Sequence, residues 1–506
     1  MNKKTIWGFL LVLISFACYF IVTSNRDNNE ECSQNDYLVI ASESVMQDAE
    51  WVEVANAIAS KHNADIVTFT TAPREMFEQI REAYPRYVAV VDKPENIGRD
   101  YVIDIHVMCR EVDEDIYGDF LWGIITGYDA DAAMRMVNNS TEPLLIKDAV
   151  ATIMELNSAK WFDNYAWVDD HTRGLWGYKN GRDGEIVTAM VEKEEVLGKF
   201  CELYESYDPD LVVTAAHATQ KNLEMPYSLG HIKPRDGKLY AHNIFTDEEF
   251  DINESGKRRV YTAVGNCLIG DMNNTRESMA AAWLNSANAA TMIGYVVTTW
   301  HGRAGWGALK YWVTSPNRYT LAEAVYMNQQ DLLHQHNEWT PGLFNKNYNY
   351  CDKYIEELTC AAETVGESLG REVDLDSAAD WDMVGFWHDR DVLVYYGDPK
   401  WDVKLQSVES ERDYTITTTV EGNKYIITIT TAENFSLERM RGDKFKQEHV
   451  LDLPFNYFFP ERLCNPRLAE GETWDAVVDE NFILVYNADF EPNSTYTISI
   501  DIDTRK

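Results

Sequence analysis

Short apolar runs alternate with amphipathic helical patterns along most of the chain, and this order limits the fold more than any other feature of the sequence. Apolar runs at 37–41, 65–70 and 87–91 are separated by helical patterns at 45–61 and 74–84. Continuous apolar strands joined by helices are typical of parallel sheets that are buried on both faces. We therefore predict an α/β fold in which helices cover both faces of a parallel sheet.

The same alternation continues into a second unit. Helical patterns at 131–137 and 146–156 close the first unit, at about residues 37–160. A region rich in Trp, Tyr, Gly and Asp at 161–184 has no clear period and is predicted to be a long surface loop, which on a rigid scaffold is often functional. The second unit, at about residues 185–400, is predicted to contain, in order, a helix at 191–207, apolar runs at 211–217 and 260–267, a helix at 276–287, an apolar run at 292–300, helices at 321–336 and 354–369, and an apolar run at 392–396.

Beyond residue 401 the pattern changes to period-two alternation. Alternating runs at 414–420 and 425–431 flank the turn Glu421-Gly-Asn-Lys424, which is a hairpin signal. Further alternating runs at 482–486 and 496–502 complete a small antiparallel sandwich of the size usual for immunoglobulin-like domains. The predicted parts of the chain are an export signal or membrane anchor plus tether at 1–36, the α/β domain at 37–400 and the β-sandwich at 401–506.

Charge and cysteine content exclude several functions. The chain has 83 acidic and 45 basic side chains and a net charge of −38. Because nucleic acid affinity comes mostly from Lys and Arg, we exclude nucleic acid as a partner, whereas basic peptide segments would be attracted. The eight cysteines include no CxxC pair, so they indicate neither a zinc site nor a dense disulfide framework, although Cys351 and Cys360 could pair in an oxidising compartment. We predict no cofactor and no metal.

The N-terminus has the pattern of an export signal. Lys3 and Lys4 precede an apolar stretch at 6–22, which matches the charged and apolar regions of such signals. Ala17-Cys18 is a candidate lipoprotein cleavage site, with Cys18 as the lipidated residue. The alternatives are an uncleaved spanning helix, for which about 17 apolar residues is the lower limit, and a simple cleaved signal. Each alternative predicts an exported protein, and either anchor would hold it at the membrane of the cell envelope.

Two apolar runs of the second unit end in residues that could perform chemistry together. The run at 211–217 ends at His217, and the run at 260–267 ends at Cys267. Parallel sheets bind ligands outside the carboxyl ends of their strands. A cysteine nucleophile needs a base that forms the thiolate and returns the proton, and imidazole titrates in the right range. We predict a Cys267/His217 dyad, with the amino end of the helix at 276–287 pointing toward the thiol and favouring the thiolate.

The segments around both residues resemble the gingipain family of caspase-like cysteine peptidases. That family carries its histidine at the end of one strand and its cysteine at the end of the next, before a Gly-Asp or Gly-Asn turn and an Ala-rich helix. The matching segments are Ala215-Ala-His-Ala218, Val264-Gly-Asn-Cys-Leu-Ile-Gly-Asp271, Glu277-Ser-Met-Ala-Ala-Ala-Trp-Leu284, Gly294-Tyr-Val-Val-Thr-Thr-Trp300 and Val394-Tyr-Tyr-Gly-Asp-Pro399. The resemblance covers about residues 37–506 and implies a caspase-like catalytic domain followed by an immunoglobulin-like domain.

The resemblance also implies an activity. The chain would be a cysteine endopeptidase that hydrolyses protein or peptide substrates through a thioester acyl-enzyme, with His217 as general acid and base and Cys267 as nucleophile. The backbone N–H groups of Cys267 and Ala218 would form the oxyanion hole. Thr299 and Trp300 lie where the family lines its specificity pocket.

Three features of the sequence qualify this resemblance. Ala218 replaces the family's usual glycine, which would strain the oxyanion hole if its φ were positive. The first strand begins by residue 37, so the sequence leaves no room for the family's N-terminal propeptide. Trp300-His301-Gly302 is a rival for the histidine role, but the family's catalytic histidine precedes its cysteine, which favours His217 and leaves His301 as a substrate-contacting residue beside Trp300.

Two questions stay open at this stage. The carboxylates that could pair with a basic P1 side chain are Asp113, Glu114, Asp115, Asp119 and Asp271, and no P1 preference follows from them. The alternative function is a catalytically silent relative that binds peptide or glycan at the cell surface, through the same crevice and the aromatic region 161–178.

Overall fold

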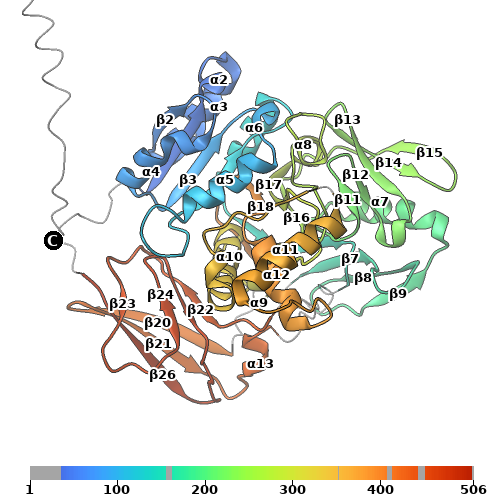
Figure 1. Ribbon diagram of the computed structural model, residues 1–506. Helices are drawn as coiled ribbons and strands as arrows, with labels where there is room; N and C mark the ends of the chain where they lie inside the picture. The colour runs from blue at the N-terminus through green and yellow to red at the C-terminus, as the bar shows by residue number, and fades with distance from the viewer. Residues whose placement is uncertain are drawn as a thin grey trace, which may run out of the picture.

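The fold is built around one large sheet. The structure is a computed structural model that describes residues 36–154, 156, 162–351, 353–406, 413–442 and 451–503. Twelve strands form the sheet in the order β2-β1-β3-β4-β18-β17-β16-β10-β6-β7-β8-β9 (Figure 1). These strands are β1 (Tyr37–Ser42), β2 (Asp65–Phe69), β3 (Tyr87–Val91), β4 (Leu121–Ile125), β6 (Asp148–Ala151), β7 (Asn164–Val168), β8 (Leu175–Asn180), β9 (Val187–Met190), β10 (Leu211–Thr214), β16 (Arg259–Ala263), β17 (Ala289–Tyr295) and β18 (Leu393–Tyr396).

The sheet consists of two parallel halves that run in opposite directions. The strands β2-β1-β3-β4-β18 are parallel to one another, and so are β17-β16-β10-β6-β7. The halves meet at β17 and β18, which pair antiparallel, and β8 and β9 extend the second half as an antiparallel ribbon. Every residue of β1, β3, β10, β16 and β17 is buried, as expected for strands that are covered on both faces.

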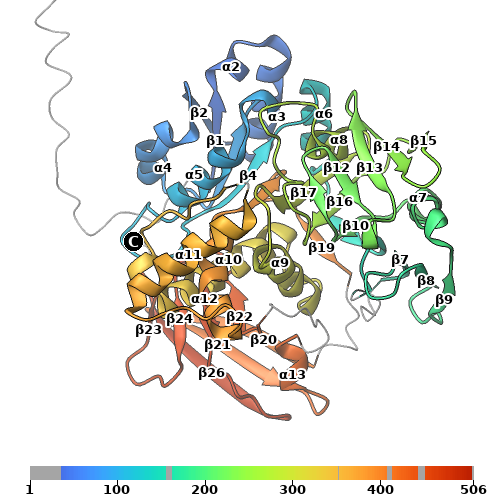
Figure 2. The same cartoon turned by 45° about the vertical axis from the view of Figure 1, so that its right-hand side comes forward.

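Helices cover both faces of the sheet, which confirms the predicted α/β fold. On one face α6 contacts α3, α8 and β17, and on the other α10 contacts α9, α12 and β4 (Figures 1 and 2). The start of α10 shows how the sequence fixes a boundary, because Thr320 and Glu323 form a reciprocal capping box there. The helices are α2 (Glu43–Met46), α3 (Ala49–His62), α4 (Phe77–Ala83), α5 (Arg99–Cys109), α6 (Ala130–Asn139), α7 (Val196–Tyr207), α8 (Met279–Asn285), α9 (Arg303–Thr314), α10 (Leu321–Trp339), α11 (Tyr354–Leu369), α12 (Ala378–Asp389) and α13 (Leu437–Met440).

Two segments differ from their sequence predictions. The helix predicted at 146–156 is wrong, because this segment contains β6, which pairs with both β10 and β7. The loop predicted at 161–184 is also wrong in part, because β7 and β8 lie within it. Tyr165 and Trp167 are buried there with stacked rings 5.2 Å apart. Gly177 lets β8 pass beneath Trp167, since a Cβ at this position would lie 2.4 Å from the indole.

A second antiparallel sheet follows His217 directly. Its five strands are β11 (Ala218–Thr219), β12 (Asn222–Glu224), β13 (His231–Arg235), β14 (Lys238–Asn243) and β15 (Glu248–Asp251), in that spatial order. The strand β14 contacts α8, so this small sheet packs beside the second half of the large one. No strand was predicted in this region, because most of these side chains are polar and face solvent on one side.

The predicted β-sandwich is present at the C-terminal end (Figure 1). Four strands, β20-β21-β26-β23, face three strands, β22-β25-β24, across a shared apolar core. These strands are β20 (Tyr414–Glu421), β21 (Lys424–Thr431), β22 (Phe455–Phe458), β23 (Arg467–Leu468), β24 (Ala476–Val478), β25 (Phe482–Val485) and β26 (Thr495–Asp501). The short strand β19 (Val403–Leu405) pairs instead with β5 (Leu144–Ile146) of the α/β part.

The structure tests the predicted disulfide but not the predicted N-terminal signal. The predicted signal and Cys18 lie outside the described residues. Among the residues that are described, no helix is long and apolar enough to span a bilayer. Cys351 and Cys360 are both free, so they do not form the disulfide that the sequence left open, whereas Cys464 is disulfide-bonded.

Candidate active site

His217 and Cys267 lie at the same edge of the large sheet. They follow β10 and β16, which are neighbouring parallel strands with Thr214 opposite Ala263. Both strands end earlier than predicted, at Thr214 and Ala263, so His217 and Cys267 stand on the short segments that leave the sheet. Adjacent strands are only about 4.8 Å apart, so the two segments leave the sheet side by side.

A buried asparagine ties these two segments together. Asn266 is fully buried, and its Oδ1 accepts a hydrogen bond from the Thr214 hydroxyl at 2.6 Å. Its Nδ2 donates to the carbonyl of Ala216 at 2.8 Å. One side chain adjacent to Cys267 thereby holds the main chain adjacent to His217. Sequence reasoning missed this role, because the partners of Asn266 come from another strand.

The chain turns sharply directly after Cys267. Leu268 has a φ of +58°, a left-handed conformation that disfavours residues with a side chain. Its N–H donates to the carbonyl of Val297 at 2.9 Å, and the Gly270 N–H donates to the carbonyl of Tyr295 at 3.0 Å. A Cβ on Gly270 would lie 2.7 Å from the backbone of Gly294, so only glycine fits. The turn is therefore fixed against the end of β17, and it presents Cys267 at its start.

The thiol of Cys267 is half-buried and is hydrogen-bonded to the main chain. Its Sγ donates to the carbonyl of Thr299 at 3.4 Å, and burial raises the pKa of the Cys267 thiol. The thiol therefore needs a nearby base to become a nucleophile at neutral pH. His217 is exposed, and its side chain forms no hydrogen bond or ion pair within the described residues. Its imidazole is thus not engaged by another described side chain at this edge of the sheet.

Two main-chain N–H groups near His217 and Cys267 donate to no other residue in the described part of the chain. One belongs to Cys267, and it interacts with the thiol of the same residue. The other is the N–H of Ala218, on the outermost strand of the small sheet. Because the Glu224 N–H donates to the carbonyl of His217, the next pair, Ala218 with Leu223, is a non-hydrogen-bonded pair whose main-chain groups point away from each other. The φ of Ala218 is not positive, so an alanine at this position, where the gingipain family has a glycine, causes no backbone strain.

The segment after β17 forms one wall beside Cys267. The strand ends at Tyr295 rather than at the predicted Trp300, so residues 298–302 form a loop. The half-buried Trp300 packs its ring against Trp381 and His388, each with ring centroids 4.7 Å away. The Thr299 carbonyl is the acceptor for the Cys267 thiol. Thr299 and Trp300 are thus beside the thiol.

His301 is enclosed, which changes its predicted role. Its side chain is 0% exposed, its Nε2 lies 3.0 Å from Asp382 Oδ1, and its Nδ1 lies 3.6 Å from Asp389 Oδ2. Burial alone would lower the pKa of His301, but the two carboxylates reverse this effect and raise it. A Cβ on Gly385 would lie 2.2 Å from the imidazole, so α12 packs directly on the ring. We therefore revise the prediction that His301 contacts substrate, because its ring supports the 298–302 loop from inside.

Asp389 anchors this loop to the first turn of α9. Its carboxylate accepts hydrogen bonds from the Ala304 N–H at 2.8 Å and from His388 Nδ1 at 2.7 Å. The other ring nitrogen of His388 lies 3.2 Å from the carbonyl of Thr298. Burial would raise the pKa of Asp389, but hydrogen bonds from His301 and His388 hold it well below the usual range. A buried charged network therefore fixes the wall beside Cys267.

The helix after Cys267 does not have the predicted position. The helix α8 begins only at Met279 and has seven residues, so the predicted start at Arg276 is wrong. The side chain of Ser278 and the carbonyl of Gln220 already accept N–H groups of its first turn. We therefore assign the thiol no stabilisation from this helix.

The five candidate P1 carboxylates do not form one cluster. Asp113, Glu114, Asp115 and Asp119 lie in the loop before β4, where the main chain of Asp119 meets Arg462 of the sandwich. Asp271 is engaged locally, with its Oδ2 accepting from Gln220 at 2.9 Å. Within the described residues, no group of three or more His, Cys, Asp or Glu side chains has the geometry of a metal site.

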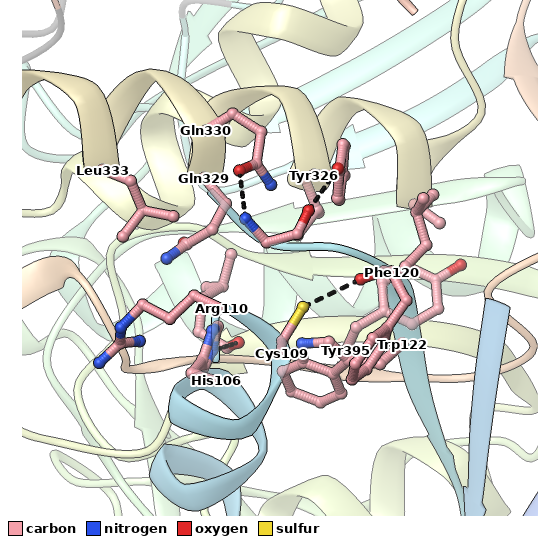
Figure 3. Close-up of a pocket in the computed structure, with 15 residues that line it drawn as sticks. His106, Cys109, Arg110, Phe120, Trp122, Tyr326, Gln329, Gln330, Leu333 and Tyr395 are labelled. Carbon is pink, nitrogen blue, oxygen red and sulfur yellow. Dashed lines mark hydrogen bonds between the residues drawn. The ribbon is translucent and has the colours of Figure 1, made fainter. Parts of the chain in front are cut away.

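A second Cys/His pair lines a small cavity between α5, β4 and α10 (Figure 3). The cavity has a volume of about 40 Å³, and none of its lining residues is a predicted site residue. Cys109 donates to the carbonyl of Phe120 at 3.1 Å, and burial raises the pKa of its thiol to about 12. Burial also lowers the pKa of His106 to about 4. Both side chains are enclosed, which distinguishes the Cys109 thiol from the half-buried thiol of Cys267.

Three comparisons with known proteins give one set of matches, all of them solved structures. No family model matches the chain, and no curated protein matches it. A search of solved structures finds the Arg-specific cysteine proteinase gingipain R (RgpB), with 9% identity, a TM-score of 0.40, and 94% of this chain and 93% of that chain covered. It also finds a complex of Porphyromonas gingivalis RgpB pro- and mature domains, with 8% identity, a TM-score of 0.41, and 93% and 94% covered. Because these TM-scores are below 0.5, the likeness decides neither fold nor activity, which depend on the geometry above.

Proposed function

We propose that this protein is an exported cysteine endopeptidase with Cys267 as nucleophile and His217 as general acid and base. The observation that carries the proposal is the pairing of two strand ends: His217 and Cys267 follow neighbouring parallel strands, and Asn266 binds one segment to the other. This arrangement supports a dyad, because a thiol with a raised pKa needs a base at hand and an exposed imidazole stands at the same edge.

The proposed reaction has two steps. In the first step, His217 takes the proton of the Cys267 thiol, and the sulfur attacks the carbonyl carbon of the peptide bond. The C–N bond then breaks, His217 gives its proton to the leaving amine, and a thioester remains. In the second step, a water molecule loses a proton to His217 and attacks the thioester, which releases the acid and restores the thiol.

The oxyanion of each step is proposed to bind to the N–H groups of Cys267 and Ala218. Neither group donates to another residue in the described chain, and the pairing pattern of β11 turns the Ala218 N–H outward. Preorganised N–H donors of this kind are worth roughly 3–4 kcal/mol of barrier in acyl transfer. Thr299 and Trp300 are the proposed substrate-contacting wall, since the Thr299 carbonyl contacts the thiol and Trp300 is partly exposed.

The proposed location is the cell envelope, outside the cytoplasm. Lys3 and Lys4 followed by an apolar stretch at 6–22 support export, with Cys18 as a candidate lipidation site or the stretch itself as the anchor. The disulfide at Cys464 is consistent with this location, since such bonds persist in oxidising compartments.

A silent relative that binds peptide is the second candidate. The observation that favours it is the environment of the Cys267 thiol, which is half-buried, has a raised pKa and is hydrogen-bonded to a carbonyl. In that case the same edge of the sheet would hold a peptide without cleaving it.

Activity profiling on a mixed peptide library separates these candidates. We expect the native protein to cleave peptide bonds, and we expect Cys267→Ala and His217→Ala to abolish cleavage. Cys360→Ser is the matched control, because Cys360 is a free and exposed thiol on α11 and its loss should change nothing. Cleavage that survives in Cys267→Ala would overturn the proposal, and the absence of cleavage by native protein with retained peptide binding would favour the silent relative.

A further inference from the structure

The outermost strand of the large sheet has an unpaired edge. The strand β9 ends the twelve-stranded order, and its only neighbour in the described sheet is β8. All four of its residues, Val187 to Met190, are exposed. Exposed edges of this kind invite pairing with another extended segment, and proteins usually block them with Lys, Pro, bulges or a covering element. The strand Val-Thr-Ala-Met contains neither Lys nor Pro.

The pairing with β8 determines which main-chain groups of β9 face outward. Val191 lies opposite Gly174 and donates its N–H to the Gly174 carbonyl, so this is a hydrogen-bonded pair. Because hydrogen-bonded and non-hydrogen-bonded pairs alternate along an antiparallel ladder, Thr188 and Met190 belong to non-hydrogen-bonded pairs. Their N–H and C=O groups therefore point away from β8, and no described residue satisfies them. This edge offers an incoming strand the regular spacing of donors and acceptors that it needs.

Apolar side chains surround this edge. Ile186, Val187 and Met190 are 49%, 42% and 61% exposed, and they are among the most exposed large apolar residues of the described chain. Exposed apolar clusters of this kind are typical of interaction surfaces. The edge can therefore supply both main-chain hydrogen bonds and apolar contacts for alternate side chains of a bound strand.

Carboxylates at both ends of β9 restrict the partner. Glu185 precedes the strand and Glu192 follows it, both are exposed, and neither forms an ion pair within the described residues. The net charge of −38 on each copy makes two copies of this chain repel each other. A basic segment instead finds a complementary charge at each end.

We propose that β9 is a docking edge for an extended segment of another protein, with an uncharged β-prone centre flanked by Lys or Arg. The segment adds to the sheet as a thirteenth strand, bonded to the outward groups of Thr188 and Met190, with its basic ends near Glu185 and Glu192. This docking does not depend on the Cys267/His217 chemistry, so it can be tested in protein that cannot cleave.

The test uses the Cys267→Ala protein and a fluorescein-labelled peptide, Lys-Thr-Val-Thr-Val-Thr-Lys, followed by fluorescence anisotropy. The key variant is Thr188→Pro, which removes one outward N–H, and proline is tolerated on an edge strand where the N–H faces solvent. The matched control is Thr188→Val, which keeps the N–H and the strand. We expect Thr188→Pro to weaken binding at least about five-fold, as for the loss of one hydrogen bond, and Thr188→Val to bind like the parent.

Charge reversal and self-association complete the test. The double variant Glu185→Lys/Glu192→Lys should weaken binding of the Lys-flanked peptide several-fold and bind the Glu-flanked analogue better than the parent does. Equal binding by Thr188→Pro and Thr188→Val, or no preference for the Lys-flanked peptide, would overturn the proposal. Sedimentation velocity measures self-association of the same proteins. A dimer that is present in the parent protein and absent in Thr188→Pro would show that a second copy, and not another protein, binds this edge.

Discussion

Replacing Asn266 by alanine tests the connection between the two strand-end segments. The substitution removes the acceptor of the Thr214 hydroxyl at 2.6 Å and the donor to the Ala216 carbonyl at 2.8 Å, at a side chain that is fully buried. The Thr214 hydroxyl keeps a second partner, Tyr261, at 2.8 Å, but the Ala216 carbonyl loses its side-chain donor. At about 1 kcal/mol for each bond and about 1–3 kcal/mol for an unsatisfied buried group, we expect a loss of roughly 2–4 kcal/mol in the free energy of unfolding.

The same substitution should disable the proposed dyad more than it destabilises the fold. Freeing the main chain beside His217 misplaces the base, and a misplaced catalytic group can cost about 100-fold in rate. We therefore expect kcat on a fluorogenic peptide to fall by about two orders of magnitude, with a smaller change in KM. Urea denaturation of the same preparation measures the stability.

A matched control separates the two effects. Asn456 is also buried, accepts from the Tyr319 hydroxyl at 2.7 Å and donates to the Pro454 carbonyl at 2.7 Å, but it lies on β22 of the sandwich. Asn456→Ala should therefore lose similar stability and keep its activity. If Asn266→Ala loses no more activity than Asn456→Ala, the connecting role of Asn266 is refuted.

Three further predictions concern titration and strain. Burial, reinforced by the charge of Asp113, raises the pKa of Asp119 well above its usual range, so the stability that Asp119 contributes is complete below about pH 4 and is lost as the pH rises through the pKa in the folded protein. The urea midpoint of the native protein should therefore be lower at pH 8 than at pH 4.5, and Asp119→Asn should reduce this difference. Equal midpoints of the native protein at both pH values would contradict the prediction. The depressed pKa of Asp389 has the opposite sign, so the stability it contributes is present above about pH 4 and is lost as the pH falls. Asp389→Asn should cost about 1–3 kcal/mol at pH 7, because an amide cannot replace both acceptor oxygens that serve the Ala304 N–H and His388 Nδ1. Unchanged stability would exclude the anchoring role. Leu268→Ala removes the apolar contacts of the leucine but keeps the cost of a φ of +58°, whereas Leu268→Gly removes both. The free energy of unfolding should therefore be about 1 kcal/mol higher for Leu268→Gly than for Leu268→Ala, and equal values would contradict the prediction.

The sheet could be predicted from the sequence wherever a strand is buried on both faces. The runs at 37–41, 87–91 and 211–217 contain such strands, because central strands need apolar side chains on both sides. The small sheet β11 to β15 left no such signature, because its strands alternate weakly and face solvent. The reversal between β17 and β18 was also beyond prediction, since strand direction depends on how the chain crosses the sheet and not on local pattern.

The candidate site shows the same division between local and long-range information. Cys267 and His217 could be singled out because each follows an apolar run, and their neighbouring positions follow from strand order. The supporting residue Asn266 could not be assigned a role, since it acts through partners on another strand. His301 has the better local pattern for a catalytic histidine, yet Asp382 and Asp389 enclose it, and both lie far along the chain on α12.

Labelling of Cys267 by an electrophilic peptide probe tests the central claim most directly. A peptidyl acyloxymethyl ketone would be added to folded native protein, His217→Ala protein and Cys360→Ser protein at pH 7, and the modified residue would be identified by mass spectrometry. We predict an adduct on Cys267 that forms at least about 100-fold more slowly in His217→Ala, because burial keeps the pKa of the thiol raised and the base is gone. Folded native protein that is not modified at Cys267, or is modified equally fast without His217, would contradict the account.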